Sequence, residues 1–147
     1  MFSYCSSLTS IPQLDTSSCT NFGSMFFNCR NLKRIEGISF KSLNKTVNYS
    51  YLTGYDNAGY LRYALIKDIG TCTGMTSIGF LSWPAWGVND ETNTDARQSL
   101  VDSLLTYSFD RATAGYSTCT ISLNAATKAL LTEDEIAQIT SKGYTIA

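Results

Sequence analysis

The first 35 residues of the chain contain one pattern twice. Met-Phe-x-x-Cys-x-x-Leu-x-x-Ile spans Met1–Ile11 and recurs as Met25–Ile35, so all five positions repeat after 24 residues. A period of about 20–50 residues is typical of solenoids, in which each repeat forms one coil stacked on its neighbours. The repeat therefore predicts a stack of coils and not a closed globule.

Each repeat is predicted to form a strand, a turn and a short helix. Leu8–Pro12 is a short extended run, in which the proline suits a strand end or edge. Apolar residues then fall at Cys19, Phe22, Phe26 and Cys29. These steps of three and four residues place them on one helical face. Neither element could hold its fold alone, so we expect stacking to supply the stability.

The repeat fades in the middle of the chain and then returns. Residues 44–60 are rich in Asn, Tyr, Gly and Ser and predict an irregular loop or a degenerate coil. Leu61–Ile69 predicts a strand, closed by a glycine. Cys72–Ile78 then matches Cys5–Ile11, which predicts that the strand register recovers and that the chain holds about three related coils.

From Asp95 the sequence changes in character. Apolar residues with helical spacing predict a helix over residues 95–108, and Asp95 with Gln98 resembles a capping box at its start. Residues 117–123 alternate between polar and apolar, which predicts a strand with one buried face.

The end of the chain carries stronger boundary signals. Thr132 and Glu135 form a second capping box, and Gly143 stands where a helix commonly ends, so a helix is predicted over residues 133–142. Residues 144–147 can add a last short strand. The fold class predicted is α/β: a solenoid of short strands and helices over residues 1–90, closed by an α/β cap over residues 91–147 in one continuous domain.

The chain has five cysteines, no CxxC pair and no histidine. An odd cysteine count without a CxxC pair argues against a complete disulfide framework and against a zinc site. Cys5 and Cys29 hold equivalent repeat positions, so they are expected in adjacent coils about 4.8 Å apart. That spacing allows a disulfide, although small buried thiols are the favoured interpretation.

Most chemical functions find no support in the sequence. There is no GxGxxG, P-loop, GxSxG or HExxH motif, and the serines lack a histidine partner. We therefore predict no catalytic residues, no metal ligands, no cofactor and no enzyme activity. A net charge of −1 without a basic cluster argues against nucleic-acid binding. No run of about 18 apolar residues predicts a membrane-spanning helix.

Binding is the better-supported function. Loops on a rigid scaffold concentrate binding residues, and Tyr and Trp are enriched at interface hot spots. The alternative is that such rings are buried between coils or cover the cap. The candidate binding residues are the aromatic ones in the least regular segments, namely Tyr49, Tyr51, Tyr55, Tyr60, Trp83 and Trp86.

The strand motif also predicts a polar face. Stacked coils align their strands into an extended concave sheet, which solenoids use for binding. The residues expected to point away from the core, and so to give a mostly polar and uncharged face, are Thr9, Ser10, Lys33, Arg34, Thr76 and Ser77.

The chain resembles BspA-like leucine-rich repeat proteins, which occur on the surface of gut Bacteroidetes and in related gut phage and metagenomic sequences. The resemblance rests on MFSYCSSLTSIPQLDTSSCTNF and MFFNCRNLKRI near the start, and on RQSLVDSLLTYSFDRA and LLTEDEIAQITSKGYTIA near the end. These segments cover 67 of the 147 residues. The resemblance implies a leucine-rich solenoid, surface display and a role in adhesion or protein binding.

Two hypotheses follow for function. In the first, the chain binds a protein or a glycan at a bacterial surface; in the second, it is a spacer or cap of a longer array, or of a phage virion protein, with no ligand of its own. There is no signal peptide, but a chain that starts in mid-pattern suggests a fragment of a longer array, so this absence does not argue for the cytoplasm. The resemblance implies a cell-surface or extracellular location. The exposed first coil also predicts self-association through the N-terminal end.

Overall fold

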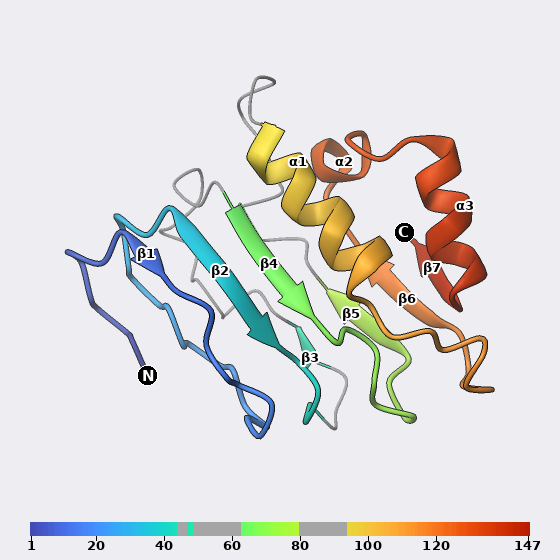
Figure 1. Ribbon diagram of the computed structural model, residues 1–147, viewed down its shortest axis with the longest axis horizontal. Coiled ribbons are helices and arrows are strands. Elements are labelled where there is room, and N and C mark those ends of the chain that lie inside the picture. The colour runs from blue at the N-terminus through green and yellow to red at the C-terminus, as the bar shows by residue number, and fades with distance from the viewer. Residues whose placement is uncertain (44–46, 49–62, 80–93) are drawn as a thin grey trace.

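The computed structural model describes residues 1–43, 47–48, 63–79 and 94–147. These residues form a mixed α/β fold with two small parallel sheets (Figure 1). The strands of the first sheet, in spatial order, are β1 (Ser10–Ile11), β2 (Arg34–Ser39) and β4 (Tyr63–Lys67). Those of the second are β3 (Val47–Asn48), β5 (Ser77–Gly79), β6 (Cys119–Ser122) and β7 (Tyr144–Ile146).

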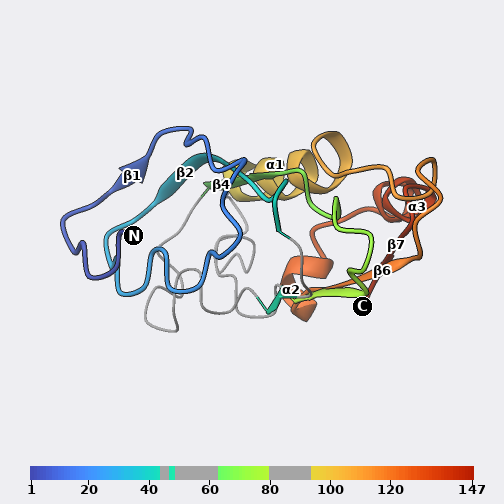
Figure 2. The ribbon, with the colours of Figure 1, turned by 90° about the horizontal axis from the view of Figure 1, so that it is seen from below.

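The two sheets form separate layers around a shared core (Figure 2). Side chains from both belong to one buried cluster, which includes Ile35 and Ile66 of the first sheet and Ile78 and Ile121 of the second. The face of each strand that points toward the other layer must carry apolar residues. Along β6, buried and half-buried residues alternate, as expected for a strand with one face in the core. The second sheet joins strands from both sides of residue 90.

The 24-residue repeat places equivalent residues beside one another. Ile11 of β1 pairs with Ile35 of β2 in parallel register, one period apart. Before the strands, the Phe2 N–H donates to the Met25 carbonyl at 2.8 Å. The Phe2 ring also stacks on Phe26, with centroids 5.7 Å apart and planes 9° from parallel. The two repeats therefore lie side by side and in register from their first residues onward.

The helix predicted within the first repeat is wrong. Residues 19–29, all of them described, contain no helix and form successive turns over residues 23–28. The equivalent helix of the second repeat lies largely outside the described residues. Ser24 and Asn28 have φ of 56° and 58°, a backbone conformation that a right-handed helix excludes. Phe22, Phe26 and Cys29 are nonetheless buried, as their spacing predicts. The spacing of three and four residues therefore predicted correctly which side chains face the core. It did not predict the backbone conformation, because successive turns can bury the same residues as a helix.

The predicted recovery of strand register at Cys72–Ile78 is also wrong. The strand in this segment, β5, pairs with β3 and β6 in the second sheet and not with β2 or β4. The chain changes layer after β4 through Asp68 and Gly70, whose φ values of 59° and 87° are both positive. The place beside β4 is taken instead by a helix, so another strand cannot extend the first sheet there.

That helix corresponds closely to the one predicted over residues 95–108. It comprises α1 (Thr94–Val101), which continues as the π-helix η3 (Asp102–Thr106). The predicted capping box at its start does not form. Asp95 lies inside the first turn, where its carboxylate accepts a hydrogen bond from Arg34, and the Gln98 amide donates to Asp102 at 2.8 Å.

The helix closes the open edge of β4. The Ile66 N–H donates to the Ser103 hydroxyl at 3.0 Å, and that hydroxyl donates to the Ser99 carbonyl at 2.6 Å. Both serines are fully buried. A buried N–H without a partner is costly, so the serine performs the task that a further strand would otherwise perform.

The strands and the helix predicted from residue 117 onward are confirmed. The strand predicted over residues 117–123 is β6, and the predicted last strand is β7, its parallel neighbour. A short α2 (Ala125–Lys128) precedes α3 (Glu133–Ser141), which packs against β7. Thr132 and Glu135 form the predicted capping box, and Gly143 follows the helix with a φ of 89°. The capping signals therefore located both ends of α3.

A buried arginine joins the two halves of the chain. Arg111 is fully buried, and its guanidinium donates to the carbonyls of Gly70, Cys72, Met75 and Ser117 at 2.7–3.0 Å. A guanidinium has five N–H donors in a rigid fork, which suits it to several carbonyls at once. It therefore holds the turn between β4 and β5 against the segment that leads into β6.

Tyr144 of β7 reinforces the same junction. Its ring is fully buried, and its hydroxyl lies 2.7 Å from the carbonyl oxygens of both Ile69 and Phe109. Burial raises the pKa of this hydroxyl well above its usual value. A Cβ at Gly70 would lie 2.1 Å from the tyrosine oxygen, so this close approach requires glycine.

All five cysteines lie within the described residues, and none forms a disulfide. Cys5 is exposed, whereas Cys29 is buried and its thiol donates to the Phe2 carbonyl at 2.8 Å. Burial raises the pKa of the Cys29 thiol. Cys29 therefore packs as a small buried group, as favoured from the sequence, while the equivalent Cys5 faces solvent.

Candidate binding surface

The aromatic residues singled out in the sequence lie outside the described residues. They are Tyr49, Tyr51, Tyr55, Tyr60, Trp83 and Trp86. Their role in binding stays a prediction, and the site below is built from other side chains.

The predicted polar face is solvent-facing but divided between two sheets. Thr9, Ser10 and Lys33 are exposed and Arg34 is half-buried, all of them at the first sheet. Thr76 and Ser77, predicted to share that face, instead lie at β5 in the second sheet.

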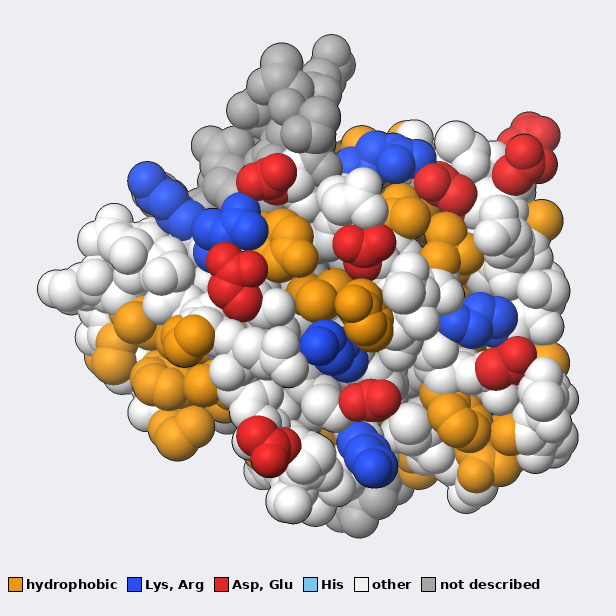
Figure 3. Space-filling model, viewed as in Figure 1, with side chains coloured by type: hydrophobic (Ala, Val, Ile, Leu, Met, Phe, Trp, Pro, Cys, Tyr) orange, Lys and Arg blue, Asp and Glu red, His pale blue; other side chains and the backbone are white. Residues whose placement is uncertain are grey.

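The outer face of the first sheet carries charged and aromatic side chains together. Ile35 of β2 and Ile66 of β4 are buried in the core. Arg34, Tyr63 and Lys67 lie an odd number of residues from them, so they are on the other face, where each is half-buried. Figure 3 shows acidic, basic and hydrophobic side chains interspersed on this side of the molecule. We define the sheet-face surface as Arg34, Glu36, Tyr63, Lys67, Asp95 and Tyr107.

Arg34 links three elements of this surface. Its Nε donates to Glu36 and its Nη1 to Asp95 on α1, both at 2.9 Å. Its Cζ lies 4.3 Å from the ring centroid of Tyr63 on β4. The hydrogen bond to Glu36, with a smaller contribution from Asp95, raises the pKa of Arg34 above its usual value. The guanidinium is therefore held over the tyrosine ring.

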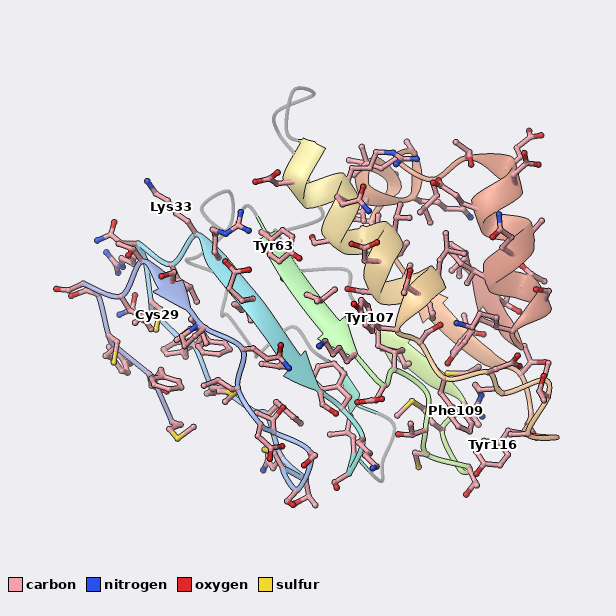
Figure 4. The ribbon with its side chains drawn as sticks, in the orientation of Figure 1. Cys29, Lys33, Tyr63, Tyr107, Phe109 and Tyr116 are labelled. Atoms are coloured by element: carbon pink, nitrogen blue, oxygen red, sulfur yellow. The ribbon has the colours of Figure 1, made fainter. Side chains whose placement is uncertain are left out.

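A second cation lies over a second tyrosine at the other end of β4. The Lys67 Nζ is 5.0 Å from the ring centroid of Tyr107, which is 41% exposed. The Tyr107 carbonyl accepts the Asp68 N–H at 2.8 Å, so the backbone beside the ring is fixed to the end of β4. Figure 4 shows Tyr63 at the start of β4 and Tyr107 near its end.

A groove of about 690 Å³ adjoins Lys67 at the carboxyl ends of β2 and β4. Its polar residues include Lys41 and Lys67 as well as Asp15 and Asp68, so the two signs of charge balance. The Ser39 hydroxyl donates to the Asp68 carboxylate. Hydrogen bonds from the side chain and backbone of Ser17 lower the pKa of Asp15. The groove thus offers fixed acceptors and two ammonium groups beside the sheet-face surface.

Both aspartates of the groove are hydrogen-bonded to serines. Within the described ranges, no group of three or more His, Cys, Asp or Glu side chains is placed to hold a metal ion. Every helix in those ranges is too short or too polar to cross a bilayer. The sheet-face surface and the groove together present aromatic rings, charges and hydrogen-bonding groups.

The chain matches no protein-family model, no curated protein and no solved structure. The candidate site therefore rests on the geometry of the sheet-face surface alone.

The two aromatic residues of the sheet-face surface, Tyr63 and Tyr107, were not predicted as binding residues from the sequence. Tyr63 lies in a correctly predicted strand, and its place three residues before the buried Ile66 was a usable signal that it faces outward. Tyr107 follows the helix by one residue, and no local pattern distinguishes it from the other tyrosines.

Proposed function

We propose that this protein is a non-enzymatic binding module of the leucine-rich solenoid type, displayed at a bacterial surface, and that its sheet-face surface binds a protein or a glycan. The observation that carries the proposal is the pair of cation–aromatic contacts at the two ends of β4. The one-period parallel register of β1 and β2 supports the solenoid class.

The composition of the surface suits recognition. Arg and Tyr are enriched among interface residues that dominate binding energy. A tyrosine held by a neighbouring cation loses little conformational freedom on binding, and its ring can stack on a sugar or an aliphatic side chain. Tyr63 belongs to β4 and Tyr107 caps the end of η3, so the two rings are attached to rigid elements and keep a fixed separation. That rigidity favours a preformed site.

Arrays of glycans and of extracellular proteins test the proposal. The native chain should bind a reproducible subset, and Tyr63→Ala with Tyr107→Ala should abolish that binding because the rings supply its contacts. Tyr4→Ala is the matched control, since Tyr4 is 67% exposed but lies at the N-terminal end. Equal loss of binding in the control would show that the sheet-face surface is not the site.

The alternative function, a spacer or cap without a ligand, has its own support. Arg111 and Tyr144 fasten the C-terminal half to the turn after β4, as a rigid closing element requires. Silence of the native chain on both arrays would favour this alternative over the binding module.

A further inference from the structure

The outer side of the first repeat presents apolar groups to solvent. Met1 and Tyr4 are 83% and 67% exposed, and with Tyr107 they are the exposed large hydrophobic residues of the described chain. Phe2 and Leu8 beside them are half-buried. A hollow of about 490 Å³ is lined by Tyr4, Cys5, Ser6, Ser7 and Leu8. We call the outer side of residues 1–15 the first-coil surface.

The contacts between the two repeats define what fits such a surface. The carbonyls of Met25 and Phe27 accept the N–H groups of Phe2 and Tyr4, both at 2.8 Å. The Tyr4 ring also meets Phe27 edge-on, with centroids 5.5 Å apart. The second repeat therefore receives its neighbour through a series of carbonyls and aromatic rings in parallel register.

One hydrogen bond runs from the second repeat to the first, since the Lys33 N–H donates to the Thr9 carbonyl at 2.8 Å. Further along, the Leu14 N–H of the first repeat donates to the Gly37 carbonyl of the second at 2.9 Å. Contacts in both directions fix the second repeat against the first along its whole length, so the register is set by the backbone as well as by the rings.

The first repeat presents equivalent groups on its outer side. One period before Met25, Phe27 and Lys33 stand Met1, Ser3 and Thr9. The backbone conformation repeats too, since Tyr4 and Asn28 have φ of 63° and 58°. The carbonyls of Met1 and Ser3 and the N–H of Thr9 thus correspond to the groups through which the second repeat holds the first.

We propose that the first-coil surface docks a polypeptide coil that carries the same Met-Phe-x-x-Cys-x-x-Leu-x-x-Ile pattern. Such a coil brings the donors and rings that the second repeat already accepts from the first, in the same parallel register. A second copy of the chain would present its own first-coil surface to this one. The two copies would then not meet in the parallel register on which these hydrogen bonds depend. The proposal is independent of what the sheet-face surface binds.

A tandem variant tests this docking. A copy of residues 1–24 is placed directly before Met1 of the full chain, and a control carries the same copy with Ser in place of its Phe2, Leu8 and Ile11. The tandem variant should unfold in one transition at a higher temperature than the native chain and the control. Hydrogen exchange at the Thr9 N–H should slow by about tenfold or more, because that group gains a partner.

Two results would overturn the proposal. The first is an unchanged unfolding temperature and unchanged Thr9 exchange in the tandem variant, which would show that the added copy does not dock. The second is a native dimer, detected by sedimentation across a concentration series, that is abolished by Tyr4→Asp. That result would assign the surface to a second copy of the chain.

Discussion

Tyr4 and Asn28 lie one 24-residue period apart and share the same left-handed backbone conformation, with φ of 63° and 58°. Residues other than glycine and asparagine rarely adopt this conformation, because it brings their Cβ atom close to the following carbonyl oxygen. Its recurrence at equivalent positions shows that the repeat preserves the path of the backbone as well as the buried side chains. The same conformation explains why a turn, and not a helix, follows each repeat start.

Substitution of Asn28 tests the cost of that conformation. Asn28→Ala should destabilise the fold by about 1 kcal/mol, since alanine lacks the local hydrogen bonding that lets asparagine adopt a positive φ. Asn28→Gly should lie closer to the native stability. Urea unfolding of the three proteins checks this order, and an alanine variant as stable as the glycine variant would contradict it.

Arg111 should be among the most sensitive positions for stability. Arg111→Lys should cost about 3 kcal/mol or more, because an ammonium cannot reach the four carbonyls that the guanidinium bonds. Arg34→Lys, at a site where both ion pairs are solvent-accessible, should cost about 1 kcal/mol or less. Chemical denaturation measures both, and similar losses for the two variants would remove the structural role given to Arg111.

Ser103 should matter for the edge of β4. Ser103→Ala leaves the Ile66 N–H buried without its partner and should cost about 1–3 kcal/mol. Ser141→Ala removes an exposed hydroxyl that bonds the Gln138 carbonyl and should change stability by less than about 0.5 kcal/mol. Thermal unfolding distinguishes the two, and faster exchange at the Ile66 N–H in Ser103→Ala would locate the effect.

Glu135 should make stability depend on pH in the acid range. Burial alone would raise its pKa, but hydrogen bonds from the Thr132 backbone and from Arg97 outweigh burial and lower the pKa. Its stabilising contribution is therefore full above the unfolded pKa of about 4.3 and is lost as pH falls through the lower folded pKa.

The corresponding measurement compares unfolding free energies at about pH 7 and about pH 3. Glu135→Gln should show a smaller loss of stability on acidification than the native chain. Glu133→Gln changes an exposed carboxylate in the same turn, so its loss of stability on acidification should be closer to that of the native chain. An unaltered loss in Glu135→Gln would mean that this ion pair does not contribute to acid sensitivity.

The sequence predicted best where local chemistry decides the structure. The capping box of Thr132 and Glu135 and the glycine at 143 delimit α3 correctly, since capping depends on residues within a few positions. The alternation through Cys119, Ile121 and Leu123 likewise located β6, because all three side chains face the core.

It predicted poorly where the decision is made by distant residues. The helical spacing of Phe22, Phe26 and Cys29 could not distinguish a helix from successive turns, and the positive φ at Asn28 excludes the helix. The placement of Cys72–Ile78 depended on Ser103 and its helix taking the edge of β4, which no local pattern records. The sheet-face surface was missed for the same reason, since Arg34 and Tyr63 meet only through strand pairing.

The most direct test of the account is the affinity of a ligand recovered from the arrays for the native chain and four variants. The sheet-face surface predicts that the dissociation constant rises about tenfold or more in Tyr107→Ala and in Tyr63→Ala, and stays near the native value in Tyr4→Ala and Trp83→Ala. Native affinity in both sheet-face variants, with binding lost only in Trp83→Ala, would contradict the account and return the site to the segment predicted from the sequence.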